Sequence, residues 1–292
     1  MHRYLLIAAV CAGALAAAPA GPATPPPAPA ASPAAAVQGP PFRWSGRIAS
    51  GKTIEVRGVL GTIRALPASG SEVEVTAVRR ALRGDPESVR IEVVPHDGGV
   101  TVCAVYPRGS GSGDGEGRRA GGREREGVRG RCEAGGPRGP GARDDDHVSV
   151  DFTVRVPAGV RLAAHNVAGD VDAEGMRGYV DARSVSGDVR ISTTGWGEAA
   201  TVSGEIVAVL GSGGWSGELD FRTVSGDITL ELPARTSTEV RVETMSGDIQ
   251  SDFPLDVERR SMRRSARGTL GRGGRELSVT TLSGDVRLRK AR

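Results

Sequence analysis

The chain has 292 residues, a formal net charge of +3 and 43 glycines, and only 3% of its residues are aromatic. This length allows one extended domain or two of ordinary size. So few aromatic residues argue against the bulky core of a compact enzyme and favour a repetitive β architecture of small residues. The modest charge does not indicate nucleic-acid binding, and we expect no nucleic-acid partner.

The first residues predict export. Residues 1–20, MHRYLLIAAVCAGALAAAPA, combine an early arginine, a short apolar run and terminal small residues, as in a secretory signal peptide. Residues 21–41 are rich in proline and alanine, cannot build a core and predict an extended tether. Cleavage after Ala36 instead of Ala20 is the alternative. No later stretch is apolar enough for a transmembrane helix, so we expect a periplasmic, cell-surface or extracellular protein.

Two cysteines, Cys103 and Cys132, remain once a signal peptide containing Cys11 is removed. An even pair in an exported protein favours a disulfide, which would close a loop of about 30 residues and contribute on the order of 3 kcal/mol. Cys11 would permit a lipoprotein instead, but Val10 precedes it where lipid attachment requires a small residue.

A Ser-Gly-Asp motif recurs along the second half of the chain, as SVSGDVRI at 184–191, TVSGDITL at 223–230, TMSGDIQS at 244–251 and TLSGDVRL at 281–288. Before the second of these, Leu219 and Phe221 alternate as in a half-buried strand, but the next apolar residue is Val224, three positions on. The same shift marks seven copies, including variants at 59–63 and 203–205. Because a strand cannot shift parity without turning its apolar row outward, each copy predicts strand, corner and strand.

We expect Val224 and its equivalents to enter the core, and the glycine two positions later to permit positive φ or close backbone approach. These turn glycines are Gly169, Gly187, Gly204, Gly226, Gly247 and Gly284. The first five are 18, 17, 22 and 21 residues apart, and a regular period indicates stacked repeats. The sequence therefore predicts an all-β fold, a β-solenoid with rungs of about 20 residues.

The remaining segments complete the predicted domain, residues 42–292. Four segments alternate cleanly and predict longer strands before the main stack: SEVEVTAVRR, SVRIEVVP, VTVCAVYP and VSVDFTVRVP. Residues 107–146, rich in glycine and arginine, have no apolar pattern and predict a mobile exposed loop. Residues 254–275 form an arginine-rich insertion that we expect outside the stack.

The serial Ser-Gly-Asp motifs, the stretches VCAVYP and VSVDFTVRVPAGV and the final SVTTLSGDVRLRKAR resemble a bacterial putative-adhesin family, an exported domain of unknown function. The resemblance covers roughly residues 42–292. It implies a β-solenoid-like fold in the cell envelope, and it carries over no catalytic residue.

If the copies stack, one acidic residue from each forms a column: Asp170, Asp188, Glu205, Asp227, Asp248 and Asp285. Neighbours about 4.8 Å apart would repel by about 1 kcal/mol in water. Turn N–H groups, or arginines such as Arg190 and Arg222, would relieve this repulsion. The alternative is Ca²⁺ bound by Asp188, Asp227 and Asp248. The nine-residue period of calcium-binding β-rolls is missing, so we favour the first arrangement and expect no metal or other cofactor.

No catalytic constellation is visible. GRIASGKT at 46–53 matches a phosphate-binding loop, but β alternation follows it where a helix is required, so we interpret the match as coincidence. His96, His147 and His165 are scattered, and there is no G-x-S-x-G motif.

These observations predict a non-enzymatic, exported cell-envelope β-repeat protein with an adhesive or interaction role. The alternatives are a polysaccharide-acting β-helix enzyme and an envelope stress or signalling accessory. We expect an envelope partner, either a protein or an anionic polysaccharide, because an arginine cluster at 259–267 would suit an anionic surface.

Overall fold

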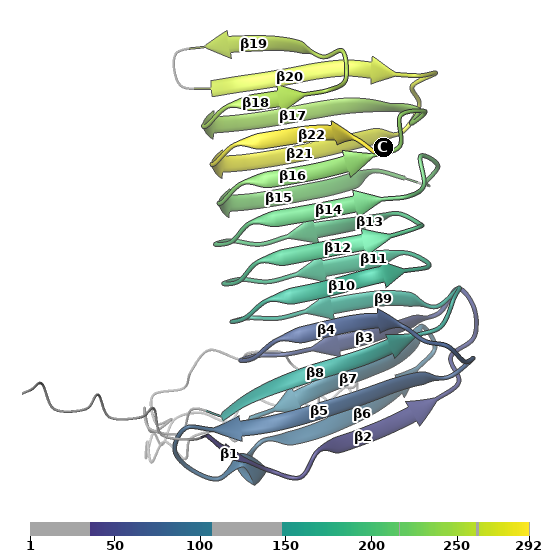
Figure 1. The fold of residues 1–292 in the computed structure, drawn as a ribbon, viewed down its shortest axis with the longest axis vertical. Helices are drawn as coiled ribbons and strands as arrows, with labels where there is room; N and C mark the ends of the chain where they lie inside the picture. Colours follow the sequence, from purple (N-terminus) through teal and green to yellow (C-terminus); the bar gives the residue numbers. More distant parts are fainter. Residues whose placement is uncertain (1–35, 107–147, 216, 261–262, 292) are drawn as a thin grey trace, which may run out of the picture. The chain divides into compact units, whose positions relative to one another are not determined.

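The computed structural model describes residues 36–106, 148–215, 217–260 and 263–291. These described residues lie in one compact unit. The described residues contain twenty-two strands, one 3₁₀ turn, η1 (Pro86–Ser88), and no α-helix, which confirms the predicted all-β class (Figure 1). The expected signal peptide, most of the tether, residues 107–146 and Cys132 lie outside the described residues.

The strands form two mixed sheets that share one apolar core. Sheet A contains β1 (Val37–Gln38), β2 (Phe42–Gly46), β4 (Ile63–Pro67), β5 (Val73–Ala81), β8 (Val148–Val156), β10 (Val171–Met176), β12 (Val189–Thr193), β14 (Ile206–Leu210), β16 (Ile228–Leu232), β18 (Ile249–Ser251) and β22 (Val286–Lys290). Sheet B contains β3 (Thr53–Arg57), β6 (Arg90–His96), β7 (Gly99–Val105), β9 (Arg161–His165), β11 (Val180–Arg183), β13 (Gly197–Ala200), β15 (Leu219–Ser225), β17 (Thr238–Ser246), β19 (Asp256–Arg260), β20 (Arg263–Leu270) and β21 (Glu276–Ser283).

The parallel part of the stack is built from rungs, each of which contributes one strand to sheet B and then one to sheet A. In spatial order the seven rungs are β3–β4, β9–β10, β11–β12, β13–β14, β15–β16, β21–β22 and β17–β18. Neighbouring rungs are in register, so that Val189, Ile206, Ile228 and Val286 form one buried column in sheet A. Such columns pack between the two sheets, which confirms the predicted β-solenoid.

The order of the rungs departs from the order of the sequence in two places. The first rung, β3–β4, lies directly beside β9–β10, although β5 to β8 separate them in the chain. The last rung of the sequence, β21–β22, is inserted between β15–β16 and β17–β18. The chain therefore turns back through β19 and β20 and places its last strands inside the stack (Figure 1).

Antiparallel strands close both ends of the stack. At the first end, β5 pairs with β8 and β6 with β7, and these are the four longer strands that the sequence predicts. At the other end, β20 pairs with β17 and β19 pairs with β20. The expectation that residues 254–275 lie outside the stack is wrong, because they contain the hairpin that extends sheet B.

Two segments at the start of the described region differ from the sequence patterns that they match. Val37 and Gln38, which we assigned to the tether, pair with the end of β5 as strand β1. Residues 46–53, which match a phosphate-binding loop, connect β2 to β3, and a strand begins at Thr53. The segment therefore lacks the helix N-terminus on which phosphate binding in such loops depends.

Candidate functional site

Each rung turns from sheet B to sheet A at a corner, and the fifth rung shows how the corner is built. In β15, Leu219, Phe221 and Thr223 are all buried, so the alternation continues without a shift as far as the threonine. Val224 is exposed, and burial resumes at Ile228 in β16. The expectation that Val224 enters the core is wrong, because the last inward position before the corner belongs to Thr223.

Buried hydroxyl groups connect successive corners. In five rungs a Ser or Thr side chain donates a hydrogen bond to the carbonyl oxygen of the turn glycine in the neighbouring rung. The pairs are Ser184 with Gly169 (3.0 Å), Thr201 with Gly187 (3.1 Å), Thr223 with Gly204 (3.3 Å), Thr281 with Gly226 (3.1 Å) and Thr244 with Gly284 (3.0 Å). We call these five side chains the hydroxyl ladder. A buried carbonyl without a partner is costly, which explains why polar residues occupy this inward position.

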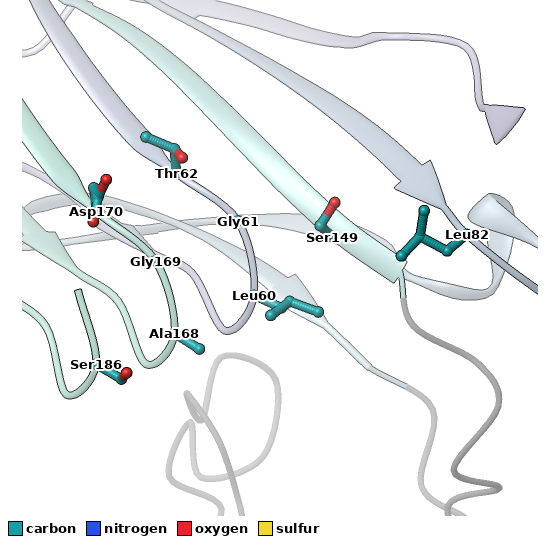
Figure 2. Close-up of a pocket in the computed structure, with 9 residues that line it drawn as sticks. All are labelled: Leu60, Gly61, Thr62, Leu82, Ser149, Ala168, Gly169, Asp170 and Ser186. Atoms are coloured by element: carbon teal, nitrogen blue, oxygen red, sulfur yellow. The ribbon is translucent and has the colours of Figure 1, made fainter. Parts of the chain in front are cut away.

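The turn glycines lie where the backbones of successive rungs approach each other most closely. Gly226 has a φ of +148°, and a Cβ atom on it would lie 2.0 Å from the carbonyl oxygen of Gly204. No side chain fits at that distance, and residues other than glycine rarely adopt this φ. Figure 2 shows the first two corners, in which Gly61 and Gly169 occupy equivalent positions.

A shallow cavity of about 510 Å³ lies beside these first corners (Figure 2). Leu60, Leu82 and Ala168 supply its apolar lining. Asp170 is the one ionisable residue among those that line it, and its carboxylate already accepts the backbone N–H of Asp188 at 2.9 Å. This cavity therefore offers no pair of groups for acid–base catalysis.

The carboxylates that follow the turn glycines form a second column along the corners. One carboxylate oxygen accepts the backbone N–H of the acidic residue in the next rung, at 2.8 to 2.9 Å. The acceptor and donor pairs are Asp170 with Asp188, Asp188 with Glu205, Asp227 with Asp285 and Asp285 with Asp248. These bonds give the column a structural role in joining rungs.

Arginine side chains lie between neighbouring carboxylates of this column. Arg287 donates to Asp227 and to Asp285, each at 2.8 Å. The backbone N–H of Asp285 and then the Arg287 guanidinium hold the pKa of Asp227 below its ordinary range. Arg222, which we expected in this column, instead pairs with Asp220 on sheet B.

The three calcium candidates, Asp188, Asp227 and Asp248, belong to the third, fifth and seventh rungs, with Glu205 and Asp285 between them. Among the residues that the structure describes, no group of three or more His, Cys, Asp or Glu side chains is placed to hold a metal ion. The arrangement gives these carboxylates backbone and arginine partners instead of one shared set of ligands.

The outer side of the corners carries a row of apolar side chains. These are Val185, Val202, Val224, Leu282 and Met245, on the third to seventh rungs. We call this row the apolar stripe, and its residues are 45% to 53% exposed. Since neighbouring rungs are about 4.8 Å apart, the stripe runs for about 19 Å along the stack. The sequence pattern did not predict this stripe, because the hydrophobicity of its residues favours a place in the core.

A groove of about 860 Å³ follows the apolar stripe. Beside the stripe, it is lined by a second column of outward-facing residues in register: Arg183, Ala200, Arg222, Thr280 and Glu243. The charged members of this column are paired: Arg183 with Asp181 (2.8 Å), Arg222 with Asp220 (3.2 Å) and Glu243 with Arg263. The groove is therefore apolar along one side, and the charged residues along its other side are neutralised by ion pairs.

A polar cluster surrounds His165 on the outer face of sheet B. The histidine Nδ1 lies 3.5 Å from Glu55 Oε1, and its Nε2 lies 3.3 Å from Asp181 Oδ2. Burial raises the pKa of both carboxyls, but hydrogen bonds from Arg57 to Glu55, and from His165 and Arg183 to Asp181, outweigh it and lower both pKa values. The partners within this cluster therefore favour the ionised forms of Glu55 and Asp181.

The other histidines and the cysteines lie elsewhere. His96 contacts the hydroxyl of Thr101 at 3.1 Å, and His147 lies outside the described residues. Cys103 is buried on β7, whereas Cys132 lies outside the described residues. The disulfide between these two cysteines therefore stays a prediction.

Residues 158–289 match the model of the family described as Toastrack DUF4097. The matched residues span the stack from the second rung to the seventh. The match covers the segment in which the serial Ser-Gly-Asp motifs occur, and it confirms the predicted resemblance to a family of unknown function. The described part of this protein contains no helix with the length and apolar character that a bilayer span requires.

Two solved structures are similar to this chain. A putative cell adhesion protein from Clostridium sporogenes ATCC 15579 is 9% identical, with a TM-score of 0.42, over 86% of this chain and 100% of that one. A putative adhesin from Bacteroides fragilis NCTC 9343 is 11% identical, with a TM-score of 0.27, over 86% of this chain and 97% of that one. No curated protein matches the sequence significantly.

Proposed function

We propose that the protein is an exported, non-enzymatic interaction protein of the cell envelope, and that the apolar stripe is its binding surface. The observation that carries this proposal is the exposure of five apolar residues on consecutive rungs. Burying such surface is worth roughly 25 cal/mol per Å². A continuous exposed row of this kind is typical of an interaction site.

The charges beside the stripe favour a protein partner over an anionic polysaccharide. Arg183, Arg222 and Arg263 already pair with carboxylates of this chain, so a polyanion would have to compete with those carboxylates. An apolar ridge of a protein, such as one face of an amphipathic helix, would cover the stripe and leave these ion pairs intact.

Export and the lack of catalysis rest on other observations. Export rests on the signal-peptide pattern of residues 1–20. The non-enzymatic character rests on the cavity beside the first corners, where Asp170 is the one ionisable lining residue and already accepts the backbone N–H of Asp188. Cleavage of an acidic polysaccharide by the purified protein, abolished by Asp181→Asn, would contradict this part of the proposal.

Photo-crosslinking tests the binding surface. A photoreactive amino acid replaces Val224 in the stripe or, as a control, Thr229, which faces outward on sheet A. In envelope extracts of the producing organism, position 224 should give one discrete crosslinked species and position 229 none. Addition of Val202→Asp and Leu282→Asp should abolish that species, because both charges would lie in the interface.

Two results would contradict the proposal. Equal crosslinking from positions 224 and 229 would show that the stripe has no preference for a partner. Crosslinking that survives both aspartate substitutions but disappears at high salt would indicate an electrostatic partner on another surface, because salt screens charges and not apolar contacts.

A further inference from the structure

Two stacked aromatic side chains lie on the outer face of sheet B in the middle of the stack. Tyr179 and Trp196 directly precede β11 and β13, and the residues that follow them, Val180 and Gly197, are buried, so the alternation turns both rings outward. Their ring centroids are 4.4 Å apart, at an interplanar angle of 53°. Both side chains are only partly buried, so this aromatic row forms part of the protein surface.

A row of carboxylates runs beside the aromatic row, two residues further along the same strands. Asp181 on β11 is in register with Glu198 on β13, and Asp220 on β15 follows in the next rung. Residues two apart on one face of a strand are about 7 Å apart, so the two rows are close neighbours. A hydrogen bond between the side chains of Tyr179 and Glu198 links them.

The arginines beside the acidic row compensate it incompletely. Arg183 pairs with Asp181 at 2.8 Å, and Arg222 pairs with Asp220 at 3.2 Å. Burial first, and then the charges of Asp181 and, more weakly, Asp220, raise the pKa of Glu198, which lies between these two ion pairs. The three carboxylates and two guanidinium groups together carry one net negative charge. A charge that is unfavourable for folding is typical of a binding surface, where a ligand compensates it.

The aromatic row already contacts one cation at its first end. The guanidinium of Arg161 lies over the Tyr179 ring, 6.0 Å from its centroid. At the other end of the row, Trp196 precedes Glu198 by two residues on the same face. A cation over the indole ring would be attracted by the ring and by the negative charge of the acidic row, and indole attracts cations more strongly than the other aromatic side chains.

We propose that Trp196 and Glu198 bind a small organic cation of the trimethylammonium class, of which choline is the simplest probe. A methylated ammonium group covers apolar ring surface, whereas a primary ammonium is strongly hydrated. The neighbouring carboxylates of Asp181 and Asp220 would repel the phosphate of a phosphatidylcholine headgroup, which favours a free cation over a membrane lipid. This site does not include the apolar stripe, so it stands independently of the protein partner proposed above.

A choline titration followed by nuclear magnetic resonance tests this inference. The full chain is isotopically labelled at its tryptophan indole N–H groups, and the signal of Trp196 is identified by its loss in Trp196→Leu. Choline should shift that signal saturably, with a Kd in the millimolar range. The signal of Trp44, on β2 outside the parallel stack, should stay in place. A neutral analogue, in which a tert-butyl group replaces the trimethylammonium group, should bind at least about five-fold more weakly.

Glu198→Gln and its matched control Glu231→Gln separate the site from the overall charge of the protein. Both variants remove one negative charge, but Glu231 lies on β16 of the other sheet, in register with Arg289. Glu198→Gln should weaken choline binding at least about five-fold, and Glu231→Gln should leave it unchanged. The pKa of Glu198 is raised, so its loss should not destabilise the fold, and weaker binding would not reflect unfolding.

Four results would overturn the inference. The first is a Trp196 signal that does not respond to choline. The second is equal affinity for choline and the neutral analogue, which would show that only apolar contact matters. The third is equal weakening by Glu198→Gln and Glu231→Gln, which would indicate attraction to the whole protein. The fourth is flotation of the parent chain with phosphatidylcholine vesicles that Glu198→Gln abolishes, which would assign the site to a lipid headgroup.

Discussion

Thr223 and Val224 are adjacent in the chain, yet the threonine is buried and the valine is exposed. The same inversion recurs at five corners, where the inner position carries a hydroxyl and the next, outer position an apolar side chain. The inner position must supply a donor to a glycine carbonyl, and a hydroxyl does so in little space. The need for a hydrogen-bond donor therefore places a Ser or Thr at the buried position of a corner. The apolar residue that follows it stays exposed and available to a partner.

The largest effect is expected on the inner side, from Gly226→Val. The new Cβ atom would lie 2.0 Å from the Gly204 carbonyl oxygen, and valine would have to hold a φ of +148°. We expect the free energy of unfolding to fall by more than about 4 kcal/mol, or the chain not to fold. Urea denaturation followed by circular dichroism measures this change.

Gly217→Ala is the control for Gly226→Val. Gly217 also has a positive φ, +86°, but a Cβ atom there would meet nothing within 4 Å. Only the backbone strain remains, which should cost about 1 kcal/mol. Equal losses at the two positions would show that the close approach of successive rungs is unimportant.

A smaller loss should follow from Thr223→Val, which keeps the side-chain volume and removes the hydroxyl. The carbonyl of Gly204 would lose the hydrogen bond from Thr223, at a cost of about 1 to 2 kcal/mol in the free energy of unfolding. Thr229→Val, on the outer face of sheet A, should change it by less than about 0.5 kcal/mol. An unchanged Thr223→Val variant would remove the hydrogen-bonding explanation for the buried threonine.

Glu198→Gln tests whether the carboxylate of Glu198, on the outer face of sheet B, lowers the free energy of unfolding when it is ionised. Burial, and then the charge of Asp181, raise the pKa of Glu198 above its ordinary value of 4.5. The folded state therefore binds this proton more tightly than the unfolded state does, so the contribution of Glu198 to stability falls as pH rises above 4.5. The variant should gain a few tenths of a kcal/mol at pH 7 after solvent screening.

The pH dependence of that gain is its control. At pH 4, below the ordinary value of 4.5, the glutamate is mostly protonated in both the folded and the unfolded chain, so most of the difference between variant and parent should be lost. Thermal melts of both proteins at pH 4 and pH 7 measure it. A gain that is the same at both pH values would show that the charge of Glu198 is not its cause.

The sequence was sufficient to predict the class of fold and the presence of rungs. Period-2 alternation with a recurring glycine has few structural solutions, and Leu219, Phe221, Ile228 and Leu230 are buried as that pattern requires. The inward position at the corner was missed because hydrophobicity alone decided the parity. A signal was available, since Thr223 continues the alternation of Leu219 and Phe221 and a Ser or Thr recurs at this position.

The order of the rungs could not be predicted from the pattern. All rungs have the same alternation of buried and exposed residues, so the pattern does not indicate which two rungs are neighbours. The chain turns back at the hairpin β19–β20. The contact of Arg264 with Gly247 and Asp248 could not be predicted for a related reason. It lies in an arginine-rich segment, and its register with Thr244 exists only because β20 pairs with β17.

The outer side of the corner should show the smallest effect on stability, and it tests the account most directly. Val224→Ser shortens a side chain that the structure places outside the core. In urea denaturation, we expect its free energy of unfolding to stay within about 0.5 kcal/mol of the parent value. A loss of about 2 kcal/mol or more would place Val224 in the core and contradict the assignment of the apolar stripe to a binding surface.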